Sequence, residues 1–427
     1  MADIKLDQLN KLFYTLLALL MWVVLPVSAQ RYVGGDISLL KAFEDNGAVY
    51  KDQNGNKIGK LLPYLKETCG MNAMRVRLFH TPKNATSAEV GQGVIQDLPY
   101  VTALGKEIKD AGLDFMLDFH YSDTWADPSK QWTPKAWVGL SDAVLADSIY
   151  AYTKKVLQTL VAAGATPDFI QTGNEITYGM CWGDVNTSSP KKFYASNGAN
   201  HTRFASLLKS AVKACREVCP QAKVILHVER TPNPTYLKQF YTYMANDQVD
   251  YDIIGLSYYS YYHGKFPTLL AAIKEMETDF PKKDIMLVEV GYYQEWQPTS
   301  ITGSYDYDYS STYPITPAGQ GAYAKDLVDT LAAHPQVKGL FWWEMDANGN
   351  NNVLKGWYNA GLFHNDDGKA CPALYTLKDF LNTSAGIEGV RPSAINHQPA
   401  TYNLQGQEVS DSYCGIVIRG GKKFIKK

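Results

Sequence analysis

The chain alternates between short apolar runs and longer amphipathic stretches, and this alternation constrains its fold more than any other feature. The runs are rich in β-branched residues and have the length of buried strands. They cover residues 33–38, 73–79, 114–120, 169–175, 223–228, 253–258, 285–289 and 339–344. Helical periodicity marks the stretches between them, among them residues 100–111, 141–163, 202–215 and 319–333. Strands that alternate with helices pair in parallel through right-handed crossovers.

Eight strand–helix units in about 355 residues predict an α/β fold, a (β/α)8 TIM barrel with enlarged loops after its strands. The alternative is an open, doubly wound sheet. Such sheets usually carry a phosphate-binding fingerprint, and the chain contains neither GxGxxG nor GxxxxGK[ST]. The net charge is −2, from 41 basic and 43 acidic residues, and the chain has no long basic block. Nucleic acid is therefore not an expected partner.

The first 29 residues have the features of a secretory signal peptide. Lys5 and Lys11 precede an apolar stretch over residues 12–25, and small residues at 27–29 supply a cleavage site before Gln30. The stretch is too short to span a bilayer comfortably, so an integral membrane protein is not expected. The alternative is a buried core helix. Export predicts a secreted, periplasmic or cell-surface protein, in which six cysteines could pair in a way that the sequence leaves open.

Three segments follow from this organisation. Residues 1–29 form the predicted signal peptide, and residues 30–385 form the predicted catalytic barrel. Residues 386–427 begin with a Gly- and Pro-containing linker and continue into a short β-type tail. We expect a monomer.

The residues that end the predicted strands are the candidates for chemistry, because a TIM barrel builds its active site at the C-terminal ends of its strands. Most of these ends are ionisable or aromatic: Asp36, Arg77, His120, Glu175, His227 or Glu229, Tyr258, Glu289 and Trp343-Glu344. Packing alone would not place such residues at nearly every strand end. We interpret their convergence as an active site at the barrel mouth.

Two carboxylates stand out at these ends. Glu175 closes the fourth predicted strand and Glu289 closes the seventh, each after an apolar run. Glycoside hydrolysis needs such a pair, one as a protonated acid and the other as an ionised nucleophile or base. Strands four and seven face each other across a small barrel, which suits the retaining separation of roughly 5–5.5 Å. For either residue alone, an exposed or ion-paired glutamate is the simpler interpretation.

Seven segments taken together resemble a known family. They are residues 34–38, 75–77, 118–128, 173–176, 255–259, 288–289 and 341–344. In this order they resemble the endo-β-1,4-galactanases of glycoside hydrolase family 53, which belong to the clan of retaining barrel glycosidases. The resemblance extends from about Gly34 to Thr383. One departure follows the fifth strand, where Val228-Glu229-Arg230 replaces the Leu-Asp-Asp of many members.

The resemblance implies roles for individual residues. Glu175 would be the acid/base and Glu289 the nucleophile, while Asn174 would hydrogen-bond the sugar 2-hydroxyl. Arg77 would lie beside the nucleophile and keep it ionised, since a nearby cation lowers a carboxyl pKa. The other implied sugar contacts are aromatic platforms (Trp125, Tyr258, Trp343) and hydroxyl partners (Asp36, His120, His227).

No cofactor is expected, although a structural calcium ion is compatible with two oxygen-rich runs. Asp306 and Asp308 lie in the loop after the seventh strand, and Asp346, Asn348 and Asn350 alternate after the eighth. A polar turn explains the second run equally well. No HExxH motif or Cys/His cluster indicates a catalytic transition metal.

The expected partner is a polysaccharide or oligosaccharide. The sequence contains 29 Tyr, 15 Phe and 9 Trp, and linear galactan is uncharged, so its sugars would stack on rings rather than pair with charges. A related enzyme acting on mannan or glucan is the near alternative. A non-catalytic glycan-binding barrel is the alternative from another class, although both carboxylates are present.

Overall fold

The structure is a computed structural model that describes residues 30–295, 309–349 and 359–382, together with the backbone of three short strands near the C-terminus. The chain divides into two compact units, residues 1–385 and residues 386–427. In the second unit, β9 (Thr401–Asn403), β10 (Gly415–Arg419) and β11 (Lys422–Lys426) form an antiparallel sheet in the order β11-β10-β9. The predicted signal peptide lies outside the described residues.

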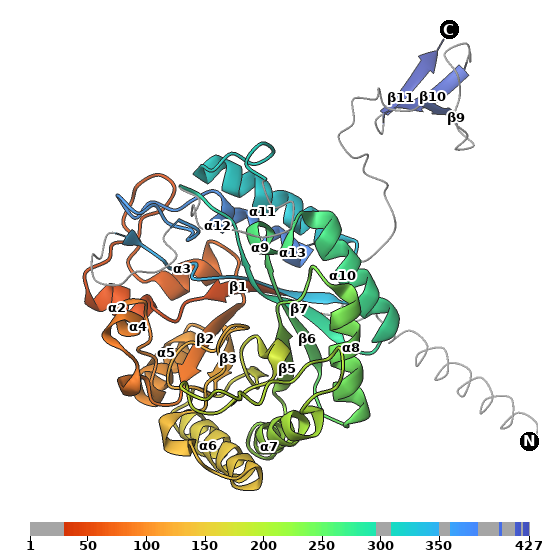
Figure 1. Ribbon diagram of the computed structural model, residues 1–427. Helices are drawn as coiled ribbons and strands as arrows, with labels where there is room; N and C mark the ends of the chain where they lie inside the picture. Colours follow the sequence, from red (N-terminus) through yellow and green to blue (C-terminus); the bar gives the residue numbers. More distant parts are fainter. Residues whose placement is uncertain are drawn as a thin grey trace, which may run out of the picture. The chain divides into compact units, whose positions relative to one another are not determined.

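Eight parallel strands close into a barrel in the first unit, as the alternating pattern predicts (Figure 1). Each strand pairs with the next one in sequence, and β1 pairs with β8 to complete the ring. The strands are β1 (Tyr32–Asp36), β2 (Ala73–Phe79), β3 (Asp114–His120), β4 (Phe169–Gln171), β5 (Lys223–Val228), β6 (Ile253–Tyr259), β7 (Asp284–Gly291) and β8 (Val337–Trp342). The TIM-barrel prediction is therefore confirmed.

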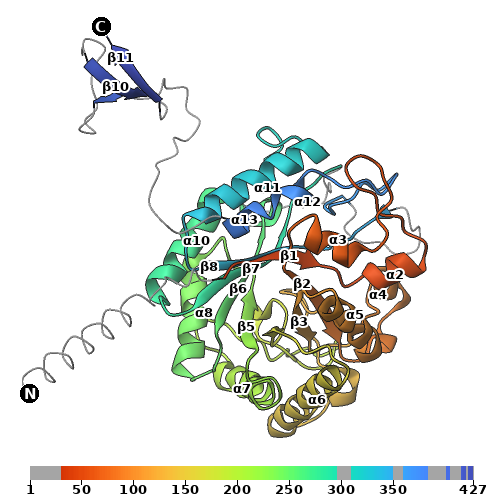
Figure 2. The ribbon, with the colours of Figure 1, turned by 180° about the vertical axis from the view of Figure 1, so that it is seen from behind.

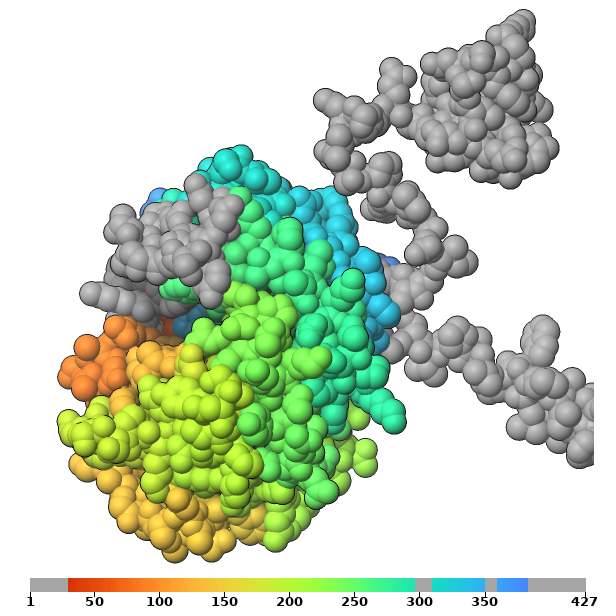
Figure 3. Space-filling view, turned by 45° about the vertical axis from the view of Figure 1, so that its right-hand side comes forward, coloured from red at the N-terminus to blue at the C-terminus, as the bar shows by residue number. Residues whose placement is uncertain are grey.

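Helices surround the strands and form the outer layer of the barrel (Figure 2). The longer ones are α5 (Leu98–Asp110), α6 (Asp142–Ala162), α7 (His201–Val218), α8 (Pro234–Asn246), α10 (Phe266–Asp279) and α11 (Pro317–Ala332). Shorter ones are α2 (Leu40–Asp45), α3 (Leu61–Glu67), α4 (Ser87–Gly91), α9 (Ser260–His263), α12 (Ala373–Thr376) and α13 (Asp379–Asn382). Figure 3 shows the closely packed surface of the barrel unit from one side.

Side-chain caps fix where several of these helices begin. Ser141 accepts a hydrogen bond from the backbone of Val144 at the start of α6, and Thr316 accepts one from Gly319 at the start of α11. Such a cap satisfies a backbone donor that the helix itself leaves free, which is worth about 1 kcal/mol. These two helices begin within two residues of their predicted starts, 141 and 319.

The barrel interior is divided into an apolar lower part and a polar upper part. Alternate residues of a strand point to opposite faces, so every second side chain enters the barrel. The lower part is a plug of Ala73, Met116, Phe169, Ile225, Ile253, Met286, Val288 and Phe341. Two residues further along four of these strands lie Arg75, Asp118, Gln171 and His227, all fully buried. The apolar plug therefore supports a layer of charged and polar groups directly below the barrel mouth.

Two further findings concern the cysteines and the membrane. The five cysteines of the described residues (Cys69, Cys181, Cys215, Cys219 and Cys371) are buried free thiols. Across the described residues, no helix is long and apolar enough to cross a membrane.

Candidate active site

Glu289 lies on β7 with its carboxylate held from two sides. Its Oε1 is 2.9 Å from Nη2 of Arg75, and the Tyr259 hydroxyl donates a 2.8 Å hydrogen bond to its Oε2. The residue is only 4% exposed. Burial raises the pKa of Glu289 to about 7, although Arg75 and Tyr259 both act to lower that pKa. The sequence predicts a lowered pKa instead; desolvation outweighs the cation because the whole group is enclosed.

The cation beside Glu289 is Arg75 and not Arg77, which corrects the sequence prediction. Arg77 Nη1 lies 3.0 Å from Asp36 Oδ1, and its Nη2 lies 3.1 Å from Glu344 Oε1. Both arginines occupy alternate positions of β2 and face the barrel interior. Arg75 lies one layer deeper, where it reaches across to Glu289, whereas Arg77 meets the ends of β1 and β8 at the mouth.

Arg75 also organises the polar layer around it. Its guanidinium contacts Asp36 and Asp118 at 2.8 and 2.9 Å, and it donates to the side-chain oxygens of Gln171 and Asn174 at 2.8 and 2.9 Å. Although burial opposes ionisation, Arg75 and His120 hold the pKa of Asp118 below its usual value. Arg75 is therefore the central cation of a buried network that includes Glu289.

We expect replacement of Arg75 by methionine to destabilise the protein and to change the titration of Glu289. Unpairing buried carboxylates should lower the free energy of unfolding by about 3–5 kcal/mol, measurable by chemical denaturation. Loss of the cation should raise the pKa of Glu289 and move the acidic limb of the activity profile to higher pH.

Arg77→Met is the matched control, because Arg77 is also a buried cation that contacts two carboxylates, Asp36 and Glu344, but it does not contact Glu289. It should destabilise the protein without an equal displacement of the acidic limb. Equal displacement in both variants would contradict the pairing of Arg75 with Glu289.

Glu175 lies on a tight turn just beyond β4. Gly173 has a φ of 116° and Glu175 a φ of 44°, so both adopt conformations that end regular strand pairing. A Cβ at Gly173 would meet the Ile176 side chain at 2.5 Å, which explains the glycine. The Gln131 side chain donates a 2.7 Å hydrogen bond to the Asn174 carbonyl. This turn is the reason that β4 ends at Gln171, four residues before the predicted end.

Strand β6 holds both carboxylates. The Ser257 hydroxyl donates a 2.7 Å hydrogen bond to Glu175 Oε1, and Tyr259 binds Glu289. Residues two positions apart share one face of a strand, so β6 presents Ser257 and Tyr259 to the same side of the site. Burial, and after it the charge of Glu289, raises the pKa of Glu175 well above its usual range. Glu289 therefore loses its proton at a lower pH than Glu175 does.

His227 lies at the end of β5 and extends the hydrogen-bond network to Glu175. Gln171 and the backbone N–H of Glu175 approach its Nδ1 at 3.0 and 3.4 Å, and Nε2 lies 2.8 Å from Ser257 Oγ. Burial lowers the pKa of His227 well below its usual value, so the ring is neutral. The side-chain oxygen of Asn174 also lies 3.0 Å from Nδ1, and the Ser257 hydroxyl donates onward to Glu175. The chain His227–Ser257–Glu175 thus orients the carboxyl group.

Tyr258 is not a platform at the mouth, which is a second correction. The residue is 0% exposed, its ring packs beside Phe266, and its hydroxyl donates to the Gly264 carbonyl at 2.8 Å. Its side chain belongs to the core between the barrel and the helices. Tyr259, the next residue, takes the place at the active site because strand alternation turns it inward.

Trp125 and Trp343 form an aromatic pair at the mouth. Their ring centroids are 6.2 Å apart, with an angle of 57° between the rings. The Arg77 guanidinium lies 4.7 Å from the Trp125 ring centroid and 5.1 Å from that of Trp343. Arg77 therefore supports the two rings through cation–π contacts.

Asp36 and His120 lie below the surface and are both fully buried. The oxygens of Asp36 face Arg75 and Arg77, and His120 Nδ1 accepts a 3.1 Å hydrogen bond from the backbone N–H of Ala126. Like His227, both side chains contact protein groups that hold the site. None of the three is exposed, whereas the predicted direct contact with a sugar hydroxyl would need an exposed atom.

The predicted calcium ligands are only partly described. Asp306, Asp308 and Asn350 lie outside the described residues. Asp346 and Asn348 are fully buried, and Asn348 donates to the Val49 carbonyl at 3.0 Å. Burial and the nearby Asp36 raise the pKa of Asp346 well above its usual range. Within residues 30–295, 309–349 and 359–382, no group of three or more His, Cys, Asp or Glu residues is arranged to hold a metal ion.

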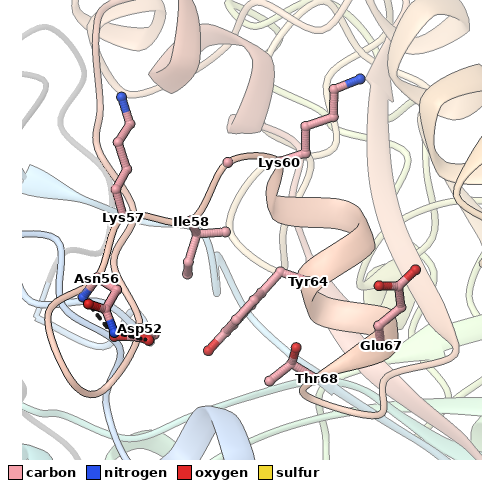
Figure 4. A pocket seen from close by; sticks show the side chains of 9 residues that line it. Asp52, Asn56, Lys57, Ile58, Lys60, Tyr64, Glu67 and Thr68 are labelled. Carbon is pink, nitrogen blue, oxygen red and sulfur yellow. Dashed lines mark hydrogen bonds between the residues drawn. The ribbon is translucent and has the colours of Figure 1, made fainter.

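A separate pocket of about 270 Å³ lies beside α3 (Figure 4). None of the predicted site residues lines it; its charged groups are Asp52, Lys57, Lys60 and Glu67. The Asp52 carboxylate accepts hydrogen bonds from Asn54 and Asn56 in its own turn. Neither Asp52 nor Glu67 is buried, so the pocket has no buried carboxyl pair like the one at the mouth.

Three groups at the site are absent from the sequence prediction: Arg75, Ser257 and Tyr259. All three lie within two residues of a predicted site residue. Residues two apart on a strand point to the same face, so the sequence does not distinguish Arg75 from Arg77. The groups on the opposite wall of the barrel distinguish them. The residue type does not mark Ser257 as a site residue, because serine is common in strands.

A closed parallel barrel with a buried carboxyl pair at its mouth, one group more easily ionised than the other, defines the class of (β/α)8 glycoside hydrolases. The comparisons with known proteins agree. The family model described as "Glycosyl hydrolase family 53" matches residues 32–377, and the chain belongs to this family.

Named relatives and solved structures support the assignment. An arabinogalactan endo-beta-1,4-galactanase of Cellvibrio japonicus is 31% identical over 374 residues, which cover 84% of this chain and 93% of the relative. A family 53 catalytic domain of Ignisphaera aggregans has a TM-score of 0.71 and 29% identity, covering 83% of this chain and 97% of that one. A fungal β-1,4-galactanase structure has a TM-score of 0.68 and 26% identity, with coverage of 82% and 99%.

Proposed function

We propose that this glycoside hydrolase cleaves β-1,4-galactosidic bonds within galactan chains and retains the anomeric configuration. One observation supports the mechanism above others: Ser257 and Tyr259, on one face of β6, hold Glu175 and Glu289, and the charge of Glu289 raises the pKa of Glu175. The substrate follows from the named relatives in the family. Side chains of pectin, type I arabinogalactan, contain such galactan.

In the first step, Glu289 attacks the anomeric carbon while Glu175 donates its proton to the departing glycosidic oxygen. The C–O bond to the leaving chain breaks as a C–O bond to Glu289 forms, giving a glycosyl ester. Arg75 and Tyr259 hold the Glu289 carboxylate in a fixed orientation for this attack. Asn174, whose side-chain oxygen accepts a 2.9 Å hydrogen bond from Arg75, contacts the 2-hydroxyl in this proposal.

In the second step, Glu175 acts as a base. After donating its proton it is ionised, and it accepts a proton from water that attacks the anomeric carbon. The ester bond breaks and Glu289 is released as a carboxylate. Two inversions give net retention. While Glu289 is esterified it carries no charge, so it no longer repels the negative charge that forms on Glu175.

The aromatic pair of Trp125 and Trp343 provides a platform for an uncharged sugar ring, with the Arg77 guanidinium beside it. The mechanism derived from these residues requires no cofactor. We further propose that residues 1–29 direct export, so that the enzyme meets the polymer outside the cytoplasm, and that it acts as a monomer.

The substrate is tested by time-resolved profiling of oligosaccharide products from linear galactan, β-mannan and β-glucan. We expect a ladder of galacto-oligosaccharides at early times, because internal cleavage releases products of many lengths. Cleavage of mannan or glucan with none of galactan would contradict the galactan assignment and favour a related β-glycanase.

A further inference from the structure

Glu229 is a third buried carboxylate near Glu175, and the mechanism above does not use it. It follows β5 directly and is 5% exposed. The Thr177 hydroxyl donates a hydrogen bond to Glu229 Oε2. Thr177 belongs to the short helix η3 (Ile176–Tyr178), which begins immediately after Glu175. Glu229 is therefore tied to the segment that carries the acid/base.

A second connection reaches the same segment through Arg230. Its Nε lies 3.2 Å from Glu229 Oε1, its guanidinium lies 5.1 Å from the Tyr178 ring centroid, and its Nη2 donates to the Tyr178 hydroxyl. Thr177 and Tyr178 are thus both anchored to the end of β5. This anchoring matters because Glu175 itself has a left-handed backbone conformation, which surrounding contacts must maintain.

We propose that Glu229 is a positioning residue for the acid/base: it holds the Glu175 turn through Thr177 and presents a second negative charge, besides Glu289, to the proton-donating carboxyl group. This proposal rests on the proposed function of Glu175. It assigns to Glu229 an effect on catalysis without contact with the substrate.

Several charged and titratable groups face the two glutamates. Those that face Glu175 are Glu289 of β7, Glu229, Asp127 of the loop after β3, Tyr259 and Tyr262 on the β6 side, and the neutral His227. Those that face Glu229 are Arg230, Asp127, Tyr236 and Tyr241. Burial raises the pKa of Glu229, whereas Arg230 and Thr177 act to lower it.

The direction of the effect follows from like-charge repulsion. A negative charge at Glu229 raises the pKa of Glu175, as burial and the charge of Glu289 also do. The acid must be protonated for the first step, so activity falls as pH rises through the pKa of Glu175. Removing the charge of Glu229 lowers that pKa, and the alkaline limb of the profile then moves to lower pH.

Glu229→Gln and Thr177→Val separate the two parts of the proposal. Glutamine keeps an oxygen that accepts the Thr177 hydrogen bond but carries no charge, so we expect the alkaline limb of kcat/KM to move down by about one pH unit. Valine matches threonine in shape but cannot donate, so kcat should fall about 10-fold with KM unchanged.

The profiles are measured on whichever of galactan, mannan or glucan the wild type cleaves. Failure of the galactan assignment is thereby a different result from failure of the role of Glu229. A Glu229→Gln profile that superimposes on the wild type, or an unchanged kcat in Thr177→Val, overturns the proposal. If Glu229→Gln does not fold, as judged by circular dichroism, the kcat of Thr177→Val decides alone.

Discussion

Replacing Glu289 by alanine should reduce turnover on linear galactan by at least about 10⁴-fold, because no other group can form the glycosyl ester. The barrel mouth stays intact around the missing carboxylate, so oligosaccharide binding should change little. Turnover is measured by reducing-end release and binding by calorimetry with a galacto-oligosaccharide.

Glu289→Gln is the control for this experiment, since it matches glutamate in shape and still accepts the Tyr259 hydrogen bond. It should be equally inactive if the loss comes from the nucleophile and not from a disturbed fold. Near-wild-type turnover in either variant would contradict the mechanism. Binding without turnover in the wild type itself would instead support a non-catalytic glycan-binding barrel.

Replacing Glu175 by alanine should give a loss that depends on the leaving group. A sugar hydroxyl needs a proton to depart, so galactan hydrolysis should fall by about 10³-fold or more. A galactoside with a dinitrophenyl leaving group needs no such proton, so its first step should remain fast. The glycosyl ester then accumulates, because no base activates water, and added azide should restore turnover by forming the β-galactosyl azide.

The comparison that decides this prediction is the ratio of the two substrate losses, measured with and without azide. Ser257→Ala serves as the matched variant, because it removes the hydrogen bond to Glu175 but leaves the carboxyl group in place. It should lose less activity and show no azide effect. Equal losses on both substrates in Glu175→Ala would argue against the acid/base role.

The fold could be predicted from the sequence because two periodicities alternate along most of the chain. For β2, β3 and β5 the predicted and observed ends coincide. Prediction fails where backbone conformation departs from the pattern. The run that predicts a strand up to Glu175 contains Gly173 and Glu175 in positive-φ conformations, and the strand ends at Gln171. An apolar pattern does not reveal this turn, which accepts a hydrogen bond from Gln131 of another loop.

The carboxylate pair was accessible to sequence reasoning because parallel strands bring their C-terminal ends to one face. The side chains that hold this pair could not be predicted in the same way. The strand pairing of β6 with β7 shifts register between Leu256 and Ser257, and that of β7 with β8 shifts between Leu287 and Val290. The residue skipped in the first shift is Val288 of β7, so β6 keeps its alternation and turns Tyr259 inward, while the register of Glu289 on β7 changes without a local sequence signal. Whether Arg75 or Arg77 pairs with Glu289 also depends on which groups lie across the barrel.

Trapping of the glycosyl ester tests the central claim most directly. The full-length protein is incubated with a 2-deoxy-2-fluoro-β-galactosyl fluoride, in which the fluorine slows both steps and the good leaving group permits the first. Digestion and mass spectrometry then locate the added sugar. We predict one fluorogalactosyl group per chain, attached to Glu289 and absent from Glu289→Gln. A label on any other residue, or wild-type inactivation without a covalent sugar, would contradict the account.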